Sequence, residues 1–269
     1  MSLQLPEVEA IRSIVLAAAR DAGLNQFRLR DRSVKEDGTI VTQTDHRVQA
    51  FIARELQANW PQFTFMGEEM EHRQQARIVG SEGASFWALD PLDGTTNYVH
   101  GLKNYCTSVA LCLDREVIVG AVFAPESNDC YTAIRNQGAW LNGDPIQVSG
   151  IQSLSESLVA CGFAPGVTAD SVEARVFLDL LDRTQSIRRL GSAALNLCYV
   201  AAGQLDAYWA LSVKPWDVAA GLLVVAESGG ILSAPEGGTV DLQHPRLISA
   251  STEALRQELS QIIRCHWPK

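Results

Sequence analysis

The chain has 269 residues, of which 46% are hydrophobic, and its formal net charge at pH 7 is −9. Such a chain is long and apolar enough to bury a substantial core, which excludes an intrinsically disordered protein. The acidic balance argues against general binding to nucleic acid or to an anionic membrane surface, because both require a basic face.

The predicted elements mix helices and strands along the chain. Two stretches with apolar residues at helical spacing predict amphipathic helices, at residues 7–22 and 46–59. Four apolar runs, the last three separated by turns and typical of an antiparallel meander, predict strands at residues 86–89, 107–113, 117–123 and 130–134. The C-terminal half adds a helix, a strand and a helix at residues 192–202, 206–210 and 218–227. This mixture predicts layered sheets and helices.

No repeat, low-complexity tract or long linker divides the chain. We therefore expect a single domain over residues 1–269, with an N-terminal α+β half to about 150 and a C-terminal α/β half from about 151. The N-terminus holds acidic residues where a secretory leader holds basic ones, and no apolar run reaches about 18 residues. The six cysteines are scattered without a CxxC pair, which favours reduced thiols. These features predict a cytoplasmic protein that makes no membrane contact.

Two carboxylates stand three residues apart in the segment Asp90-Pro-Leu-Asp93, where the predicted strand ends. We read this segment as a turn in which Pro91 fixes one φ angle and Gly94 permits close backbone approach. The two acids then converge on one point while the following N–H groups face outward, which suits a divalent cation with a phosphate. Taken alone, the segment equally fits an ordinary turn in which Asp93 caps a helix.

Other acidic residues lie at comparable places. Glu68 and Glu69 follow an apolar strand end, and Asp217 stands at the predicted N-cap of an apolar helix. Each has an ordinary alternative, as a solvated pair or a simple cap. Together, Glu68, Asp90, Asp93 and Asp217 form an all-oxygen ligand set, which favours Mg²⁺ over zinc because zinc prefers His and Cys.

Several segments resemble, in their order, the motifs of the inositol monophosphatase family: Gly67-Glu-Glu69, Asp90-Pro-Leu-Asp-Gly-Thr-Thr-Asn97, Gly191-Ser-Ala-Ala-Leu-Asn196, Trp216-Asp-Val-Ala-Ala-Gly221 and Glu227-Ser-Gly-Gly230. They span most of the chain, and the second and fourth motifs are highly specific in combination. The resemblance implies an α/β (α+β) protein with the layered αβαβα sugar-phosphatase fold, similar to inositol monophosphatase and fructose-1,6-bisphosphatase. It also implies a magnesium-dependent, lithium-sensitive phosphatase that forms a homodimer.

The resemblance assigns roles to individual residues. Two or three Mg²⁺ ions would be held by Glu68, Asp90, Asp93, Asp217 and the carbonyl group of Leu92. The catalytic residues would be Glu68 and Thr95, which activate the attacking water, with Asp45 orienting Thr95. The substrate would be contacted by Asp93, Gly94, Thr95, Ser192, Ala193 and Asp217.

The residues also support this chemistry without the resemblance. Metal ions can neutralise a phosphate monoester, lower the pKa of a bound water and stabilise the departing alkoxide, so no covalent phosphoenzyme is required. The chain lacks the GxxxxGK[ST], HExxH and GxSxG motifs of three other hydrolytic classes. Lys35, the only basic residue in a Gly-containing loop, either steers phosphate or is a solvated loop lysine.

The substrate is less determined than the reaction. Inositol 1-phosphate or a related polyol or sugar phosphate is expected, with histidinol phosphate, fructose 1,6-bisphosphate and 3'(2')-nucleotides as alternatives. Family members that hydrolyse inositol phosphates typically carry a glutamate shortly before the Trp-Asp motif, whereas this chain has Ala210 there. An alternative of a different class is a regulatory protein that binds the transcription machinery.

Overall fold

The computed structural model describes residues 5–22, 24, 32–35 and 38–267. Its helices are α1 (Val8–Asp21), α2 (Gln43–Asn59), α3 (His72–Gly80), α4 (Thr95–His100), the 3-10 helix η1 (Leu154–Glu156), α5 (Val172–Leu181), α6 (Ala193–Ala201), α7 (Pro215–Glu227) and α8 (Glu253–His266). Its strands are β1 (Arg32–Val34), β2 (Ile40–Thr42), β3 (Thr64–Gly67), β4 (Ser85–Asp93), β5 (Cys106–Leu113), β6 (Glu116–Ala124), β7 (Asp129–Ile134), β8 (Gly138–Leu141), β9 (Asp144–Pro145), β10 (Leu158–Gly162), β11 (Ser186–Arg188), β12 (Ala207–Ala210), β13 (Ile231–Ser233) and β14 (Leu247–Ala250).

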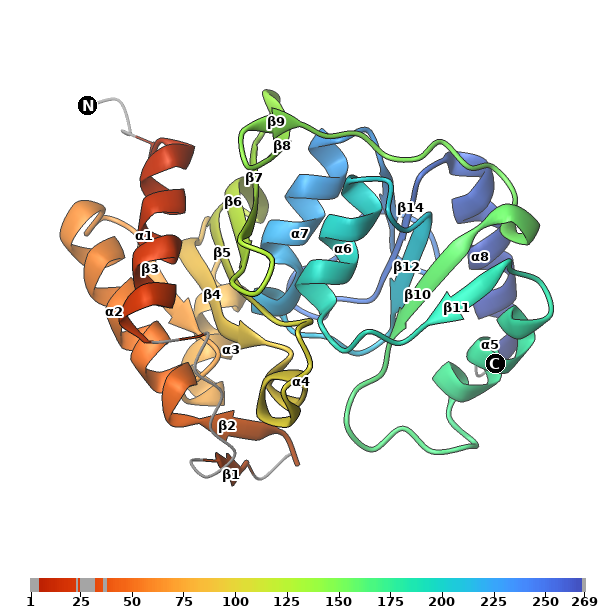
Figure 1. Cartoon of the computed structure of the whole chain (residues 1–269), viewed down its shortest axis with the longest axis horizontal. Helices are drawn as coiled ribbons and strands as arrows, with labels where there is room; N and C mark the ends of the chain where they lie inside the picture. The colour runs from red at the N-terminus through yellow and green to blue at the C-terminus, as the bar shows by residue number, and fades with distance from the viewer. Residues whose placement is uncertain (1–4, 23, 25–31, 36–37, 268–269) are drawn as a thin grey trace.

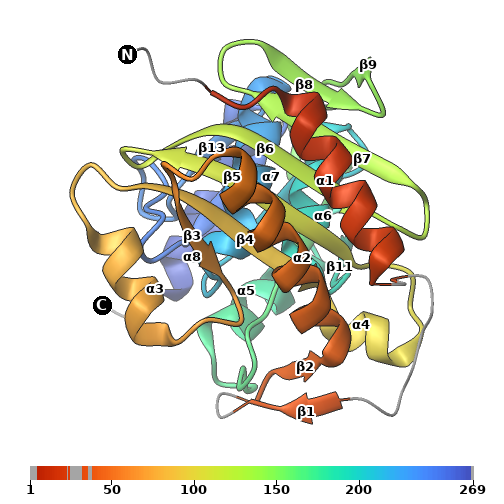
Figure 2. The ribbon, with the colours of Figure 1, turned by 90° about the vertical axis from the view of Figure 1, so that its left-hand side faces the viewer.

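The first sheet has seven strands in the order β3-β4-β5-β6-β7-β8-β9. Strands β3 and β4 are parallel, and every following pair is antiparallel. The predicted meander is thus confirmed as β5, β6 and β7. Along β4, Trp87 and Leu89 pack with α1 and α2, whereas Phe86 and Ala88 pack on the opposite face, as the two-residue period of a strand requires. Figure 2 shows α1 and α2 lying across this sheet.

The second sheet has five strands in the order β11-β10-β12-β14-β13. In β12, Tyr208 and Ala210 face the core that contains α6 and α7, and Ala207 and Trp209 face α5 and α8. Helices α6 and α7 therefore lie between the two sheets, and Figure 1 shows the resulting succession of helices, sheet, helices, sheet and helices. The predicted layered αβαβα fold is confirmed.

Two glycines let the layers approach closely. A Cβ atom on Gly120 of β6 would lie 3.0 Å from the Cα of Ala220 in α7, and one on Gly221 would lie 2.7 Å from the side chain of Leu197 in α6. Backbone atoms cannot move aside as the end of a flexible side chain can. The packing of α7 against β6 and α6 therefore depends on the absence of a side chain at both positions.

Two predicted helices begin earlier than their apolar spacing indicated. Helix α2 begins at Gln43 because Thr42 and Asp45 form a capping box, in which the Thr42 amide donates to the Asp45 carboxylate at 2.8 Å. Helix α7 begins at Pro215, a residue suited to the first helical position. The prediction that Asp217 is the N-cap is therefore wrong, and Asp217 lies in the first turn of α7.

Several elements were not predicted, among them α3, β10, α5, β14 and α8. The buried residues Leu255, Leu259 and Ile262 of α8 follow helical spacing, so that signal is present in the sequence. Strands β10 and β14 are four or five residues long and buried in their centres, where periodicity does not separate strand from helix. Among the described residues, no helix is long and apolar enough to cross a membrane.

Candidate active site

A cavity of about 790 Å³ opens where the two sheets and the central helices meet. It is lined by all predicted metal and substrate residues: Glu68, Asp90, Leu92, Asp93, Gly94, Thr95, Ser192, Ala193 and Asp217. Asp45 does not line the cavity, and its Oδ1 atom lies 3.4 Å from the Thr95 hydroxyl. Residues up to 149 positions apart in the sequence, Glu68 and Asp217, thus reach the same space.

A β-bulge in β4 directs Asp90 and Asp93 into this cavity. Asp90 is opposite Ser108 and Asp93 is opposite Cys106, so β4 contains one residue more than its partner β5. In a regular strand, residues three apart point to opposite faces, and the extra residue allows both carboxylates to face the cavity. The bulge is held by the Thr107 hydroxyl, which donates to the carbonyl of Pro91 at 2.9 Å. The prediction of a turn at residues 90–93 is therefore wrong, because the strand continues through them.

Helix α4 follows the bulge directly and places Thr95 at its N-terminus. Gly94 has φ +91°, and a Cβ atom there would lie 2.9 Å from the carbonyl oxygen of Asn104, so glycine is required on both counts. The Thr95 hydroxyl donates to the carbonyl of Leu92 at 2.9 Å and lies 3.4 Å from Asp45 Oδ1. Burial raises the pKa of Asp45 to about 7, although its hydrogen bonds from Thr42 oppose the shift.

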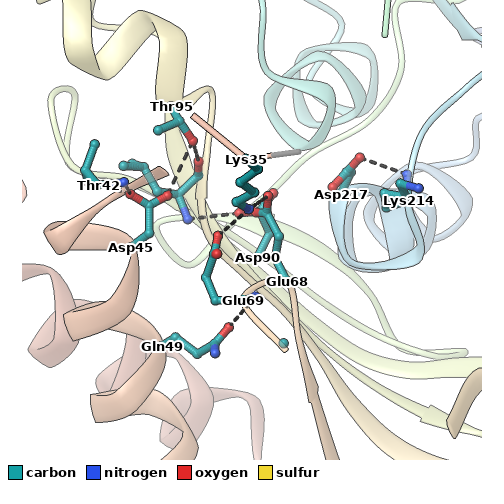
Figure 3. A network of polar contacts seen from close by, with 12 residues as sticks. Lys35, Thr42, Asp45, Gln49, Glu68, Glu69, Asp90, Thr95, Lys214 and Asp217 are labelled. Atoms are coloured by element: carbon teal, nitrogen blue, oxygen red, sulfur yellow. Dashed lines mark hydrogen bonds and ion pairs between the residues drawn. The ribbon is translucent and has the colours of Figure 1, made fainter. Parts of the chain in front are cut away.

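Lys35 lies between two carboxylates. Its ammonium group is 2.9 Å from Glu68 Oε1 and 2.6 Å from Glu69 Oε1 (Figure 3). Burial alone would lower the pKa of Lys35, but the charges and hydrogen bonds of the two glutamates outweigh it and raise the pKa. Gln49 fixes the same segment by accepting a hydrogen bond from the Glu69 amide at 3.0 Å. Of the two interpretations of Lys35, the solvated loop lysine is wrong.

The remaining carboxylates repel one another. Burial and then the charges of neighbouring acids, Glu68 among them, raise the pKa values of Asp90 and Asp217 well above the ordinary range. Burial also raises the pKa of Asp93 to about 6, although hydrogen bonds from Ser192 and Ala194 oppose this. A nearby positive charge would relieve this repulsion and favour the ionised forms.

Asp93 joins the two halves of the site. Its Oδ2 atom accepts hydrogen bonds from the Ser192 hydroxyl at 2.6 Å and from the Ala194 amide at 2.7 Å. Ser192 is the N-cap of α6, so a residue of the first sheet binds the start of the helix that lies against both sheets. The position of Asp93 is thereby tied to the segment predicted to contact substrate.

The donor set fits magnesium in its chemistry, since the cavity presents carboxylate and carbonyl oxygens. Within the described part of the chain, no three His, Cys, Asp or Glu side chains stand close enough together to hold one ion as they are. The hydrogen bonds explain this, because Lys35 binds Glu68 and Glu69, and Asp217 accepts from the Lys214 amide at 2.8 Å on its own helix. Figure 3 shows Asp217 set apart from the cluster around Lys35.

Comparison with known proteins identifies the family. The model of the inositol monophosphatase family matches residues 4–267. The chain belongs to the inositol monophosphatase family. Members of this family are phosphoric monoester hydrolases that depend on metal ions, and the resemblance found in the sequence motifs is confirmed.

Individual relatives cover almost the whole chain. The inositol-1-monophosphatase of Rhizobium meliloti (strain 1021) is 35% identical over 262 residues, which cover 96% of this chain and 94% of the relative. The protein called Nus factor SuhB of Pseudomonas aeruginosa is 35% identical over 266 residues, or 95% of this chain and 96% of the relative. Among solved structures, the IMPase of Thermotoga maritima is 30% identical, with a TM-score of 0.85 and 96% of each chain covered.

Ala210, where the family's inositol phosphatases typically carry glutamate, is fully buried and does not line the cavity. A Cβ atom on Gly162 would lie 3.2 Å from the Ala210 Cβ. Gly162 itself does line the cavity. Ala210 therefore lies directly behind the cavity wall, and the wall at this point has no carboxylate.

Other parts of the site escaped sequence analysis because they depend on contacts between distant segments. The Asn97 side chain donates to the carbonyl of Asn104 at 2.7 Å and to that of Leu190 at 2.8 Å. It thereby holds the segment before Ser192 against α4. Arg189 also lines the cavity, and its position next to the Leu-Gly-Ser-Ala-Ala segment was the available signal.

Proposed function

We propose that this member of the inositol monophosphatase family hydrolyses small phosphate monoesters with the help of two or three Mg²⁺ ions. The observation that carries the proposal is the convergence on one cavity of Glu68 after β3, Asp90 and Asp93 in the bulge of β4, and Asp217 in the first turn of α7. The raised pKa values of Asp90, Asp93 and Asp217 indicate a site whose charge is completed by cations.

The metal ligands in this proposal are Glu68, Asp90, Asp93, Asp217 and the carbonyl oxygen of Leu92. When bound, Mg²⁺ supplies charge neutralisation of the phosphate, a water of lowered pKa and stabilisation of the leaving alkoxide. To hold metal, Glu68 would give up its present contact with the Lys35 ammonium group.

The other site residues position the reactants. The Thr95 hydroxyl donates to the carbonyl of Leu92 and lies 3.4 Å from Asp45 Oδ1, which supports the proposal that Thr95 orients a water for Glu68 to deprotonate. The amides of Gly94 and Thr95 start α4 and suit a phosphate oxygen. Ser192 and Ala193 begin α6 and, with Asp93 and Asp217, contact the leaving group.

The expected substrate is inositol 1-phosphate or a related polyol or sugar phosphate. Because the wall in front of Ala210 lacks a carboxylate, inositol 1-phosphate should bind more weakly than in a relative with glutamate there, by roughly 10- to 100-fold for one charge-assisted hydrogen bond. Histidinol phosphate, fructose 1,6-bisphosphate and 3'(2')-nucleotides remain alternatives. The proposal includes residues 1–269 acting as one domain, a homodimer, and a cytoplasmic location, which the free cysteines support.

The test is phosphate release from a panel of these esters, with Mg²⁺ and with EDTA. We expect release that requires Mg²⁺ and is lost in Asp93→Asn. Ala210→Glu should improve kcat/KM for inositol 1-phosphate if this position limits inositol recognition. An inactive wild-type protein across the panel would contradict the proposal.

A second candidate function is a regulatory role through binding to the transcription machinery. It is supported by the relative named Nus factor SuhB, which is 35% identical over nearly the whole chain. The intact set of acids in the cavity favours the enzyme, since binding to a protein partner does not need it. If the wild-type protein releases no phosphate from any ester of the panel, the second candidate function is favoured.

A further inference from the structure

The turn that carries Glu68 and Glu69, here called the acidic turn, follows β3 directly and leaves the sheet. The Glu68 amide still donates to the carbonyl of Leu89 in β4 at 3.0 Å. This bond continues the pairing of β3 with β4 for one residue. Beyond it, the polar backbone groups of the acidic turn need partners from side chains or from water.

Gln75 of α3 binds the backbone of the acidic turn at two points. Its Nε2 atom donates to the carbonyl of Gly67 at 2.8 Å and to the carbonyl of Glu68 at 2.9 Å. Gln75 is 4% exposed and is the buried residue of α3. Burial of a polar side chain costs free energy unless its hydrogen bonds are made, so the two carbonyls account for the position of this glutamine.

The partners of Gln75 determine how its amide group is oriented. Both backbone partners are carbonyls, which only accept hydrogen bonds, so the NH₂ group faces them and the Oε1 atom faces away. This Oε1 atom lies 3.0 Å from Nδ1 of His72. Since Oε1 can only accept, Nδ1 of His72 is the donor. His72 lines the cavity, so hydrogen bonds lead from the cavity wall through α3 to the backbone of Glu68.

A second glutamine, Gln49 of α2, binds the next peptide group of the acidic turn. Its Oε1 atom accepts a hydrogen bond from the Glu69 amide at 3.0 Å (Figure 3). A Cβ atom on Gly67 would overlap this oxygen. The close approach of Gln49 therefore depends on the absence of a side chain at Gly67.

Four successive backbone groups are thus bound: the Gly67 carbonyl, the amide and carbonyl of Glu68, and the Glu69 amide. A turn at the surface commonly leaves such groups to water. Support from side chains matters here because the charge of Glu68 repels Asp90. A loosely held turn would let these two carboxylates move apart.

We propose that two glutamines and a histidine, Gln75, Gln49 and His72, are positioning residues for the acidic turn and thereby raise the affinity of the site for Mg²⁺. Metal ligands must be held within about 0.5 Å of the binding geometry. Groups that hold ligands in this way typically contribute roughly 10- to 100-fold to metal affinity. The inference rests on the proposed metal-dependent function and adds three residues that lie outside the family's sequence motifs in this chain.

Isothermal titration calorimetry of the EDTA-treated full chain with Mg²⁺, in the absence of substrate, tests the role of Gln75. Gln75→Met removes both donated hydrogen bonds and keeps the length of the side chain. It should raise the apparent Kd for Mg²⁺ roughly 10- to 100-fold. Gln74→Met is the matched control, because Gln74 is the exposed neighbour on the same helix. The control should keep the wild-type Kd.

His72 offers a second test that does not disturb a buried residue, because His72 is exposed. His72→Ala removes the donor to Gln75 and should raise the apparent Kd for Mg²⁺ roughly 2- to 10-fold, the value of one neutral hydrogen bond. His72→Asn should restore the wild-type Kd, because its side-chain NH₂ group can donate to Gln75 Oε1. Since no substrate is present, a contact of His72 with substrate does not affect the result.

Gly67→Ala tests Gln49 without changing it, because the added methyl group takes the space of Gln49 Oε1. It should raise the apparent Kd for Mg²⁺ roughly 2- to 10-fold, as should Gln49→Met. The double variant should have no higher Kd than the single variants, because both substitutions remove the same contact. Additive effects of the two substitutions would remove Gln49 from the proposal.

The outcomes separate this inference from the proposed function. A purely structural role of Gln75 would lower the melting temperature in EDTA and leave the Kd for Mg²⁺ unchanged, and this result for Gln75→Met would overturn the inference while the proposed function stands. If Gln75→Met does not fold, equal Kd values for His72→Ala and the wild type would overturn it instead. A wild-type protein that binds no Mg²⁺ would overturn the metal-dependent function, and the inference with it.

Discussion

Asp93→Asn should stabilise the metal-free protein above neutral pH and abolish its stabilisation by Mg²⁺. Both strong hydrogen bonds to the Asp93 side chain, from the Ser192 hydroxyl and the Ala194 amide, end on the same oxygen, Oδ2. The amide oxygen of the introduced asparagine can take that place and accept both. The substitution therefore removes a repelling charge and a metal ligand while it keeps the link to α6.

The expected gain in the free energy of unfolding follows from the pKa of Asp93. A folded-state value of about 6 instead of 3.8 corresponds to about 3 kcal/mol for holding the ionised form at about pH 8. Water in the cavity screens the charge, and a neutral acceptor weakens the two hydrogen bonds, so we expect a gain of about 1–2 kcal/mol. In a chain of this size, that gain raises the melting temperature by roughly 2–8 °C.

In Mg²⁺, the wild type should become the more stable of the two proteins. At a Mg²⁺ concentration of about 100 times its Kd, the ion stabilises the folded state by about 2.7 kcal/mol. The Asp93→Asn protein lacks one ligand and should gain clearly less. The order of melting temperatures is thus expected to reverse between EDTA and excess Mg²⁺.

Scanning calorimetry of both proteins in EDTA and in Mg²⁺ measures this reversal. Asp179→Asn is the matched control, because Asp179 lies away from the cavity and binds Arg183 and His266. Its loss should lower the melting temperature slightly and leave the response to Mg²⁺ unchanged. An Asp93→Asn protein that is less stable than wild type in EDTA, and equally stabilised by Mg²⁺, would refute the reasoning.

Three further predictions concern pH, catalysis and packing. In EDTA, stability should fall as pH rises from about 4 to 7, because the pKa values of Asp93 and Asp45 in the folded state, about 6 and about 7, exceed 3.8; a melting temperature that rises over this range contradicts it. Thr95→Val should lower kcat on the order of 10²-fold or more with little change in stabilisation by Mg²⁺. The control Thr96→Val, at an exposed neighbour, should leave kcat unchanged. A Thr95→Val protein with ordinary turnover would show that Thr95 serves only in packing. Gly120→Val should lower the free energy of unfolding in urea by about 1–3 kcal/mol or more, because a Cβ atom at this position lies 3.0 Å from the Cα of Ala220 in α7. An unchanged urea midpoint of unfolding would show that α7 and β6 can move apart without loss of stability.

The local elements were open to prediction wherever neighbouring residues carry the signal. The spacing of Ile11 and Val15 in α1, and of Val48 and Ile52 in α2, marks one buried face on each helix, because a helix against a single sheet face buries one stripe. The three strands of the meander are equally clear. Helix α7 is different, since it is buried on nearly all sides between two sheets, and its boundary at Pro215 followed from capping and not from periodicity.

By itself, the sequence determined the alternation of helices and strands, the acidic residues that line the cavity and the family, because motifs and periodicity involve residues close together in the chain. Only the tertiary structure decided that Asp90 and Asp93 face one cavity through a β-bulge, since that depends on the register of β4 against β5. It alone placed Lys35 between Glu68 and Glu69. Lys35 is 33 and 34 residues away from these two partners in the chain, so the contact depends on how distant segments pack and not on any local pattern of residues.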